Sequence, residues 1–335
     1  MAIFSLFYRY STSSRVCFFK LTYSYNCFSK ILFVFSLYLY IIISFLEEIM
    51  EKIIIVTDTG CDLPKDNLIE NNVEYLELTY ILDGVEYSSF QDEVSFSEFY
   101  DRVSKGAKTS TSCINETTFE EKFLSLAKDG SNVLYLAFSS GLSATYDNAV
   151  KASKTVNEKL GDDRITVFDT KGASCGHGYL VLIASRLAKE GRSVGFIVNE
   201  LKHTKIMHRF TVADLMHLKR GGRLSGFSAV VGSMLKVQPM LVCDNADGKL
   251  KVVDKIMGKK AVNPYFIKKM MAEIDLTEDK PFIIIAHAEC LPNAETLKSD
   301  ILKHIPNASI VINYIGHVIG SHCGKGTLAV FYKSK

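Results

Sequence analysis

Apolar residues along the chain gather into short runs that alternate with polar loops and amphipathic stretches. Continuous apolar runs, typical of strands buried on both faces, lie at 53–56, 133–137 and 165–168. Helical periodicity is found in the intervening segments, at 97–105, 116–128, 143–159 and 176–189. This repeated order of strand, short polar loop and helix predicts an α/β domain that is built on a parallel sheet, with the loops at one edge of the sheet.

From about residue 209 this alternation changes. Helical patterns remain at 226–235 and 261–273, and strand patterns lie at 236–242, 251–257, 282–287, 308–314 and 327–332. The turn sequence DNADGK at 244–249 favours a hairpin, and therefore antiparallel pairing. We predict two α/β domains, an N-terminal one at 50–208 with a parallel sheet and a C-terminal one at 209–335 with a mixed sheet.

The first 49 residues differ from the rest of the chain. They contain no Gly and no Pro, although the whole chain has 21 and 6. Their apolar run, 31–46, is shorter than the about 20 residues that span a bilayer, and no small-residue cleavage site follows it. Translation from Met50 would begin almost directly with the first strand. We expect that 1–49 is a mis-assigned upstream extension; the alternative is a hydrophobic leader.

Charge and cysteine content narrow the function classes. The formal net charge is +2, and after residue 49 basic and acidic residues are equal in number, so no overall basic field attracts nucleic acid. A nucleic-acid module would have to rely on local basic residues, namely Arg220, Arg223, Lys255, Lys259 and Lys260. The six cysteines after Met50 form no CxxC pair and no zinc spacing, which favours a reducing cytoplasm and no metal.

Hydroxyl-rich loops are the candidate chemistry. KTSTSC (108–113) precedes one helix, and SSGLS (139–143) joins a buried strand to another. Hydroxyls and the N–H groups of a helix start bind anions, so converging loops of this kind predict a carboxylate or phosphate site. A serine-dependent hydrolase or acyl transferase is the enzymatic alternative, in which Ser140 or Ser143 would pair with His287 or His322. The GxSxG elbow is absent from the sequence.

A basic, glycine-rich segment, KRGGRLS, lies at 219–225. Arg220 and Arg223 flank two glycines, so both guanidinium groups can project from an exposed turn. The residues alone leave two interpretations open, a solvated turn and a docking patch for an acidic partner.

Taken together, seven ordered motifs resemble those of the DegV family of bacterial fatty-acid-binding proteins. They are TDTGCDL (57–63), KTS (108–110), SGLSAT (140–145), DT (169–170), RFTVADLMHLKRGGRLSGFSA (209–229), DGKL (247–250) and GHVIGSHCGKG (316–326). The resemblance covers the chain from about Lys52 to the C-terminus. It implies a two-domain protein that buries one long-chain fatty acid in an apolar tunnel, largely in the second domain.

The resemblance also implies residue roles. Carried over by position, four hydroxyl groups would hold the carboxylate between the domains, those of Thr109, Ser110, Ser140 and Ser143. His322 would join their hydrogen-bond network. In relatives that work with a fatty acid kinase, the kinase transfers phosphate from ATP to the bound carboxylate. Arg220 and Arg223 would form the face met by the kinase or by a membrane surface. We expect no catalytic residue and no cofactor in the chain itself, and a cytoplasmic monomer.

The chain departs from the family pattern at several positions. Thr111-Ser112 replaces a usual Gln-Pro, Ala144 a usual Gly, Lys325 a usual Pro, and Met257 a residue that is often Arg. Fatty-acid binding is expected to tolerate these changes better than a particular kinase partnership does.

Overall fold

The computed structural model describes residues 35–36, 52–90, 93–224 and 237–335, and residues 52–335 form one compact unit. The helix predicted at 226–235, and all but two of the first 49 residues, lie outside the described residues. Within the described part of the chain, no helix is both long enough and apolar enough to cross a bilayer.

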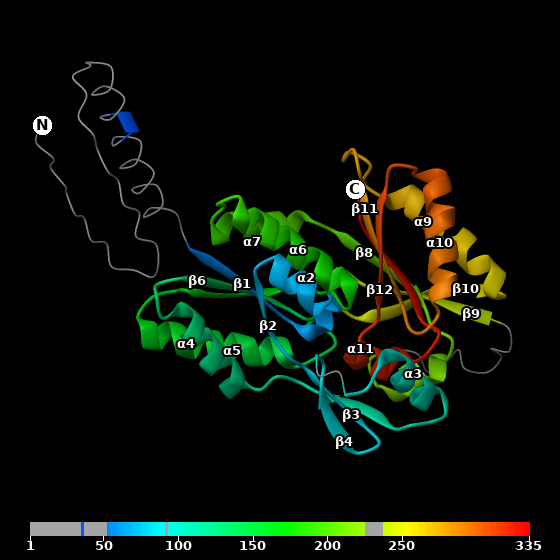
Figure 1. Cartoon of the computed structure of the whole chain (residues 1–335), viewed down its shortest axis with the longest axis horizontal. Helices are drawn as coiled ribbons and strands as arrows, with labels where there is room; N and C mark the ends of the chain where they lie inside the picture. Colours follow the sequence, from blue (N-terminus) through cyan, green and yellow to red (C-terminus); the bar gives the residue numbers. More distant parts are fainter. Residues whose placement is uncertain (1–34, 37–51, 91–92, 225–236) are drawn as a thin grey trace, which may run out of the picture. The chain divides into compact units, whose positions relative to one another are not determined.

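The first half of the unit is built on a four-stranded parallel sheet (Figure 1). Its order is β2-β1-β6-β7, from strands β1 (Ile53–Asp58), β2 (Val73–Leu76), β6 (Asn132–Ala137) and β7 (Ile165–Asp169). Each neighbouring pair is parallel, which confirms the predicted architecture. The carboxyl ends of these strands therefore share one edge of the sheet, where ligands of open α/β sheets usually bind.

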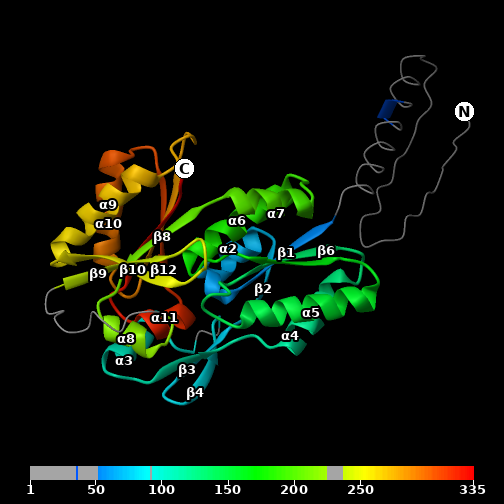
Figure 2. The same ribbon diagram turned by 180° about the vertical axis from the view of Figure 1, so that it is seen from behind.

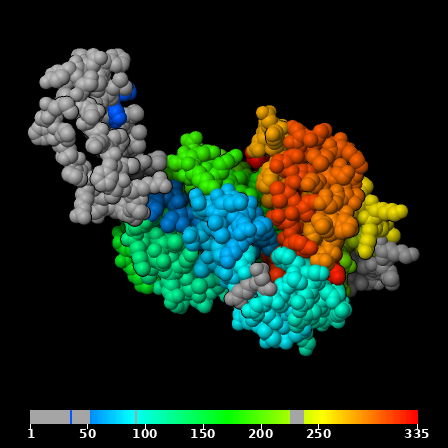
Figure 3. All heavy atoms as spheres, in the orientation of Figure 1, coloured from blue at the N-terminus to red at the C-terminus, as the bar shows by residue number. Residues whose placement is uncertain are grey.

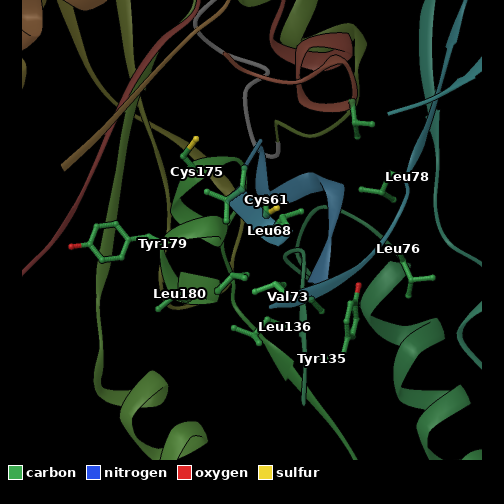
Figure 4. Packing of buried hydrophobic residues seen from close by; sticks show 14 of the residues in the cluster. Cys61, Leu68, Val73, Leu76, Leu78, Tyr135, Leu136, Cys175, Tyr179 and Leu180 are labelled. Atoms are coloured by element: carbon green, nitrogen blue, oxygen red, sulfur yellow. The ribbon is translucent and has the colours of Figure 1, made fainter. Parts of the chain in front are cut away.

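Helices cover both faces of this sheet. They are α2 (Lys65–Glu70), α4 (Glu116–Ala127), α5 (Thr145–Leu160) and α6 (Cys175–Lys189), with α7 (Val194–His203) packed on α6. Figure 4 shows Leu136 of β6 on the α6 side and its neighbour Tyr135 on the opposite side. Tyr135 contacts Phe119 of α4 at 5.0 Å between ring centroids. Both residues are fully buried, as continuous apolar strands require.

The second half is built on a mixed six-stranded sheet of order β10-β9-β8-β13-β11-β12. The strands are β8 (Ile206–Thr211), β9 (Val237–Cys243), β10 (Leu250–Met257), β11 (Phe282–His287), β12 (Ser309–Tyr314) and β13 (Leu328–Lys333). Only the β11–β12 pair is parallel, so the predicted mixed sheet is confirmed. The helices α9 (Val262–Glu273) and α10 (Leu291–His304) pack on it, preceded by the short helix η3 (Lys259–Ala261). The predicted domain boundary at 208 falls inside β8 and stays a prediction.

Helix α6 lies between the two sheets, and its residues are buried nearly all round. Two glycines permit the close approach on each side. A Cβ at Gly176 would lie 2.0 Å from Nε2 of His208 in β8, and a Cβ at Gly178 would lie 2.7 Å from the carbonyl oxygen of Cys61. A side chain at Gly176 would clash with the His208 ring, and one at Gly178 with the Cys61 backbone after β1, so the first turn of α6 requires glycine on both sides.

A third, smaller sheet of order β4-β3-β5 consists of β3 (Thr79–Leu82), β4 (Val85–Ser88) and β5 (Thr109–Ser112), with α3 (Phe96–Ser104) beside it. The prediction of a polar loop at 108–113 was wrong, because 109–112 pair antiparallel with β3. The strand lacks apolar alternation, which hid it in the sequence. It packs on α11 (His317–Cys323), and Figures 1 and 2 show α3, β3 and α11 side by side next to α8 (Leu215–Arg220).

Candidate functional site

A cavity of about 440 Å³ lies where the edge of the parallel sheet meets the six-stranded sheet and α11. This volume is within the usual range of small-molecule pockets. Four segments contribute most of the wall: the end of β5 (111–113), the loop after β6 (138–144), the inner face of β8 and β13, and α11. In the space-filling view of Figure 3 the segment that contains β3 and α3 abuts the C-terminal part of the chain.

The lining of the cavity is partly exposed and polar and partly buried and mainly apolar. The lining residues with exposed side chains are Ser112, Cys113, Ser140 and Ala144, so the mouth lies between β5 and the loop after β6. The interior is lined mainly by buried or half-buried apolar side chains, which include Phe138, Phe210, Leu218, Ile315, Val318 and Phe331. Three buried polar residues also line it, namely Ser174, His208 and Thr327. An amphiphile with a polar head at the mouth fits this distribution of side chains.

The loop after β6 is fixed by the hairpin turn between β9 and β10. Ser139 Oγ donates to the carbonyl oxygen of Gly248 at 2.7 Å. A Cβ on Gly141 would lie 2.5 Å from the carbonyl oxygen of Asp247, and one on Gly248 would lie 2.1 Å from Ser139 Oγ. Lys171, after β7, adds a bond from Nζ to the Ala246 carbonyl at 2.7 Å. The predicted hairpin turn is confirmed, and it holds the loop after β6, whose residues 140–144 line the cavity.

The two candidate serines of this loop have different hydrogen bonds. Ser140 Oγ donates to Asp169 Oδ2 at 2.5 Å, and its N–H donates to Oδ1 of the same carboxyl at 3.2 Å. Ser143 Oγ accepts from the N–H of Thr145 at 3.2 Å and lies 2.9 Å from Thr145 Oγ1. When the Thr145 hydroxyl donates in that contact, the Ser143 proton is available to a ligand. Ser143 is therefore the better placed donor of the two.

His322 lines the cavity from α11. Its Nε2 lies 2.9 Å from Thr111 Oγ1 of β5, and Gly221 packs against the ring, where an added Cβ would be 2.8 Å from Nδ1. Burial, and secondly the charge of Arg223, lower the pKa of His322 to about 4, so the imidazole is neutral at pH 7. A neutral ring that donates from Nε2 to Thr111 leaves the threonine proton free for a ligand.

The two arginines of the basic segment have different surroundings. Arg223 lines the cavity, and its Nη1 donates to the carbonyl oxygen of Gly221 at 2.6 Å. Arg220 points into solvent, with 64% of its side chain exposed and a 3.4 Å contact to Asp214. The sequence predicted that both guanidinium groups share one exposed face, and the structure brings only Arg220 to that position. The cause is the turn at 221–222, where Gly222 takes a positive φ of 71°.

Two further predicted residues, Thr109 and Ser110, are not among the residues that line the cavity. Thr109 Oγ1 donates to the carbonyl oxygen of Ser321 at 2.8 Å, so it holds the last turn of α11. Ser110 lies on the exposed side of β5. The lining residues of this strand are instead Thr111 and Ser112, followed by Cys113. A period-2 reading of the strand groups Thr109 with Thr111 and Ser110 with Ser112, so alternation alone does not separate the lining residues from the others.

The serine–histidine pairing of the enzymatic alternative is not formed among the described residues. Ser140 bonds Asp169, Ser143 contacts Thr145 and His322 contacts Thr111. His287, at the end of β11, is buried, and its Nδ1 accepts from the N–H of Cys290 at 3.3 Å. The geometry therefore offers neither serine a histidine base.

Fold and cavity define an α/β protein of two large sheets and one small sheet, with a pocket of mixed polar and apolar lining where they meet. The match to the DegV family, a family of uncharacterised proteins, extends over residues 52–335. A DegV domain-containing protein from Clostridium perfringens is 40% identical over 286 residues, which are 84% of this chain and 98% of that relative. The chain belongs to the DegV family, and the predicted resemblance is confirmed.

Solved structures agree with this assignment. A fatty-acid-binding DegV family protein from Thermus thermophilus superposes with a TM-score of 0.75 at 28% identity, covering 85% of this chain and all of that one. DegV of Bacillus subtilis, a fatty acid binding protein, gives a TM-score of 0.73 at 28% identity with the same coverage. The fold of the chain is thus that of fatty-acid-binding relatives.

Proposed function

We propose that this protein binds one long-chain fatty acid in the cavity, with the carboxylate at the mouth and the acyl chain in the apolar interior. The observation that carries the proposal is the composition of the lining: hydroxyls, an imidazole and a guanidinium that are partly exposed, and a larger set of aromatic and aliphatic side chains that are mostly buried. The fatty-acid-binding relatives from Thermus thermophilus and Bacillus subtilis support it.

The head group needs donors, because removing a carboxylate from water costs several kcal/mol unless hydrogen bonds replace its hydration. Ser143, Thr111 and Arg223 supply O–H and N–H groups that line one end of the cavity. Ser140 borders the mouth and orders the loop through its hydrogen bond to Asp169. Thr109 donates to the Ser321 carbonyl and so holds the turn that carries His322. In this proposal Ser110 has the smallest role, since it is exposed.

The acyl chain supplies most of the binding free energy. Each CH₂ moved from water into the apolar interior contributes about 0.8 kcal/mol, which is roughly a fourfold gain in affinity per carbon. A calorimetric series of saturated fatty acids from 10 to 20 carbons tests this. We expect affinity to rise with length and then level off where the cavity is full; an affinity independent of length would contradict the proposal.

A neutral analogue tests the role of the mouth. Octadecanol has the same apolar chain as stearate but no carboxylate for Arg223 and the hydroxyls. We expect it to bind at least tenfold more weakly, because a charged hydrogen bond contributes about 1.5–3 kcal/mol. Equal affinity for the two would mean that the polar residues at the mouth do not hold the head group.

We further propose that the loaded protein presents the carboxylate to a fatty acid kinase. In that reaction a carboxylate oxygen attacks the γ-phosphorus of ATP, ADP leaves, and an acyl phosphate is formed. The open mouth leaves the head group accessible. Arg220 is exposed and precedes Gly221, which packs against the cavity-lining His322, so its charge suits an acidic partner. Incubation of the loaded protein with a fatty acid kinase and ATP should yield acyl phosphate; a carrier without a kinase partner would yield none.

A further inference from the structure

A groove of about 570 Å³ lies on the face of the six-stranded sheet opposite the cavity proposed for the fatty acid. Strand β8 shows the division, because His208 and Phe210 line that cavity whereas Met207 and Arg209 line the groove. The rest of the groove is formed by the residue before β8, by β9, β10 and the turn between them, and by α9. Among the described residues only Cys243 lines both, so the groove is a separate site.

Arg209 is buried beside the groove with part of its hydrogen-bonding capacity unused. Its Nε and Nη2 donate to the carboxylate of Glu273, and Nε also contacts the Tyr332 hydroxyl at 3.0 Å. Nη1 forms no hydrogen bond with a described residue, yet it is not among the buried polar atoms that are sealed from solvent without a partner. Because Arg209 lines the groove, Nη1 can donate to a ligand there, and the bonds to Glu273 hold the guanidinium in place.

Two lysines add positive charge that no described carboxylate balances. Lys205, directly before β8, is exposed and forms no ion pair with a described residue. Lys269 of α9 is half-buried, and its ammonium lies 5.6 Å from the centroid of the Tyr265 ring, one turn earlier on the same helix. Arg209 is neutralised by Glu273, so the net charge of the groove comes from these two lysines.

The acidic groups near the groove do not cancel this charge. Among the described lining residues Asp244 is the only acid, and Nζ of Lys251 binds its carboxylate at 2.6 Å. Asp254 lies near Tyr265 but is exposed and outside the lining, where solvent screens it. Two unbalanced cations beside a guanidinium with free donors match a phosphate monoester, which carries a charge of about −1.5 to −2 and three acceptor oxygens.

The groove also has an apolar part that a free phosphate ion would leave uncovered. Met207, Val242 and Val253 line it together with the ring of Tyr265. Val253 is 48% exposed and lies where the register of β10 against β9 shifts, and such a bulge redirects a side chain. The volume is within the range of small-molecule sites, about 300–1,000 Å³. The fitting ligand therefore has a body as well as an anionic group.

We propose that the groove binds a phosphate ester with an apolar or aromatic body. Lys205 and Lys269 balance the charge of the phosphate, Nη1 of Arg209 donates to its oxygens, and Tyr265 and Val253 contact the body. This second site is independent of the proposed function, because it requires no fatty acid and lies on the other face of the sheet.

The test is a calorimetric titration with three probes at pH 7.5 and low salt: ADP, phenyl phosphate and inorganic phosphate. The wild-type protein is compared with a double variant, Lys205→Ala with Lys269→Ala. The matched control is Lys202→Ala with Lys268→Ala, which removes two exposed lysines of α7 and α9 that do not line the groove. None of the four lysines forms an ion pair with a described residue, so both double variants should unfold at the urea concentration of the wild type.

We expect the wild type to bind at least one of the two esters more tightly than inorganic phosphate, because only the esters bury the apolar lining. The Lys205 and Lys269 double variant should bind that ester at least about tenfold more weakly, since it loses two charged contacts. The control should stay within about threefold of the wild type, because exposed charges outside the groove are screened.

Three results would overturn the inference. The first is no binding of any probe by the wild type at about 5 mM ligand. The second is an equal loss of affinity in both double variants, which would mean that the probes respond to overall charge. The third is inorganic phosphate binding as tightly as both esters. Displacement of a bound ester by stearate would place it in the other cavity and would also overturn the inference, whereas a protein that binds no stearate leaves this test intact.

Discussion

Replacing Gly141 with alanine perturbs the contact between the β9–β10 turn and the loop after β6, which lines the cavity. The added Cβ would lie 2.5 Å from the Asp247 carbonyl oxygen and 2.8 Å from the carbonyl carbon and oxygen of Gly248. These are backbone atoms, so no side chain can rotate away, and the turn must move. Overpacking of this kind costs about 1–3 kcal/mol, and losing the Ser139–Gly248 bond adds about 1 kcal/mol.

We therefore expect Gly141→Ala to lower the free energy of unfolding by about 2–4 kcal/mol, a large part of the 5–15 kcal/mol typical of a domain. The matched control is Gly195→Ala in α7, where no atom lies within 4 Å of an added Cβ and where alanine favours the helix by up to about 1 kcal/mol. Because the chain has no tryptophan, urea unfolding is followed by circular dichroism.

The same displacement opens the cavity beside its mouth, so stearate affinity of Gly141→Ala should fall at least tenfold while that of Gly195→Ala stays at the wild-type value. The reasoning is refuted if Gly141→Ala unfolds at the wild-type urea concentration, or if it is destabilised and still binds stearate as the wild type does. The second result would mean that the turn supports the fold but does not form a wall of the site.

Further predictions concern single side chains. Thr111→Val should weaken stearate binding about 2- to 10-fold in calorimetry, because it removes one neutral hydrogen bond. Ser110→Ala should change the affinity less than twofold, because Ser110 is exposed. A larger loss of affinity in Ser110→Ala than in Thr111→Val would support the role that the family motif implies for Ser110. Arg220→Glu should retain stearate but slow acyl phosphate formation with a kinase, and equal rates would remove Arg220 from the docking surface. Burial lowers the pKa of His208 to about 4, so its contribution to stability is complete above about pH 6.5 and is lost as the pH falls toward 4. The urea unfolding midpoint should therefore decline less steeply over that pH range in His208→Gln than in the wild type. Equal slopes for the two proteins would contradict this prediction.

The elements that sequence predicted well are those with a strong hydrophobic pattern. The buried runs that became β1, β6 and β7, and the helices between them, could be located within a few residues, because continuous apolar strands and amphipathic helices have distinct periods. The turn at 244–249 was equally clear from its Asp, Asn and Gly content. In contrast, β5 was missed, since TSTS has no apolar alternation and its pairing with β3 is a tertiary contact.

The candidate site was only partly predictable for a related reason. Ser140, Ser143 and His322 could be proposed from loop position and family motifs, and the structure brings all three to one cavity. The roles of Thr111 and Arg223 depend on which side of a strand or turn they leave the backbone. No local pattern in the sequence encodes this property.

The most direct test of the account is native mass spectrometry of the protein purified from a bacterial host, followed by release and identification of the bound molecule. The account predicts a one-to-one complex with a long-chain fatty acid, lost in a variant that combines Thr111→Val with Ser143→Ala. A protein that is empty as purified and remains empty after incubation with stearate would contradict it, and would direct attention to phosphate-bearing ligands for the same polar mouth.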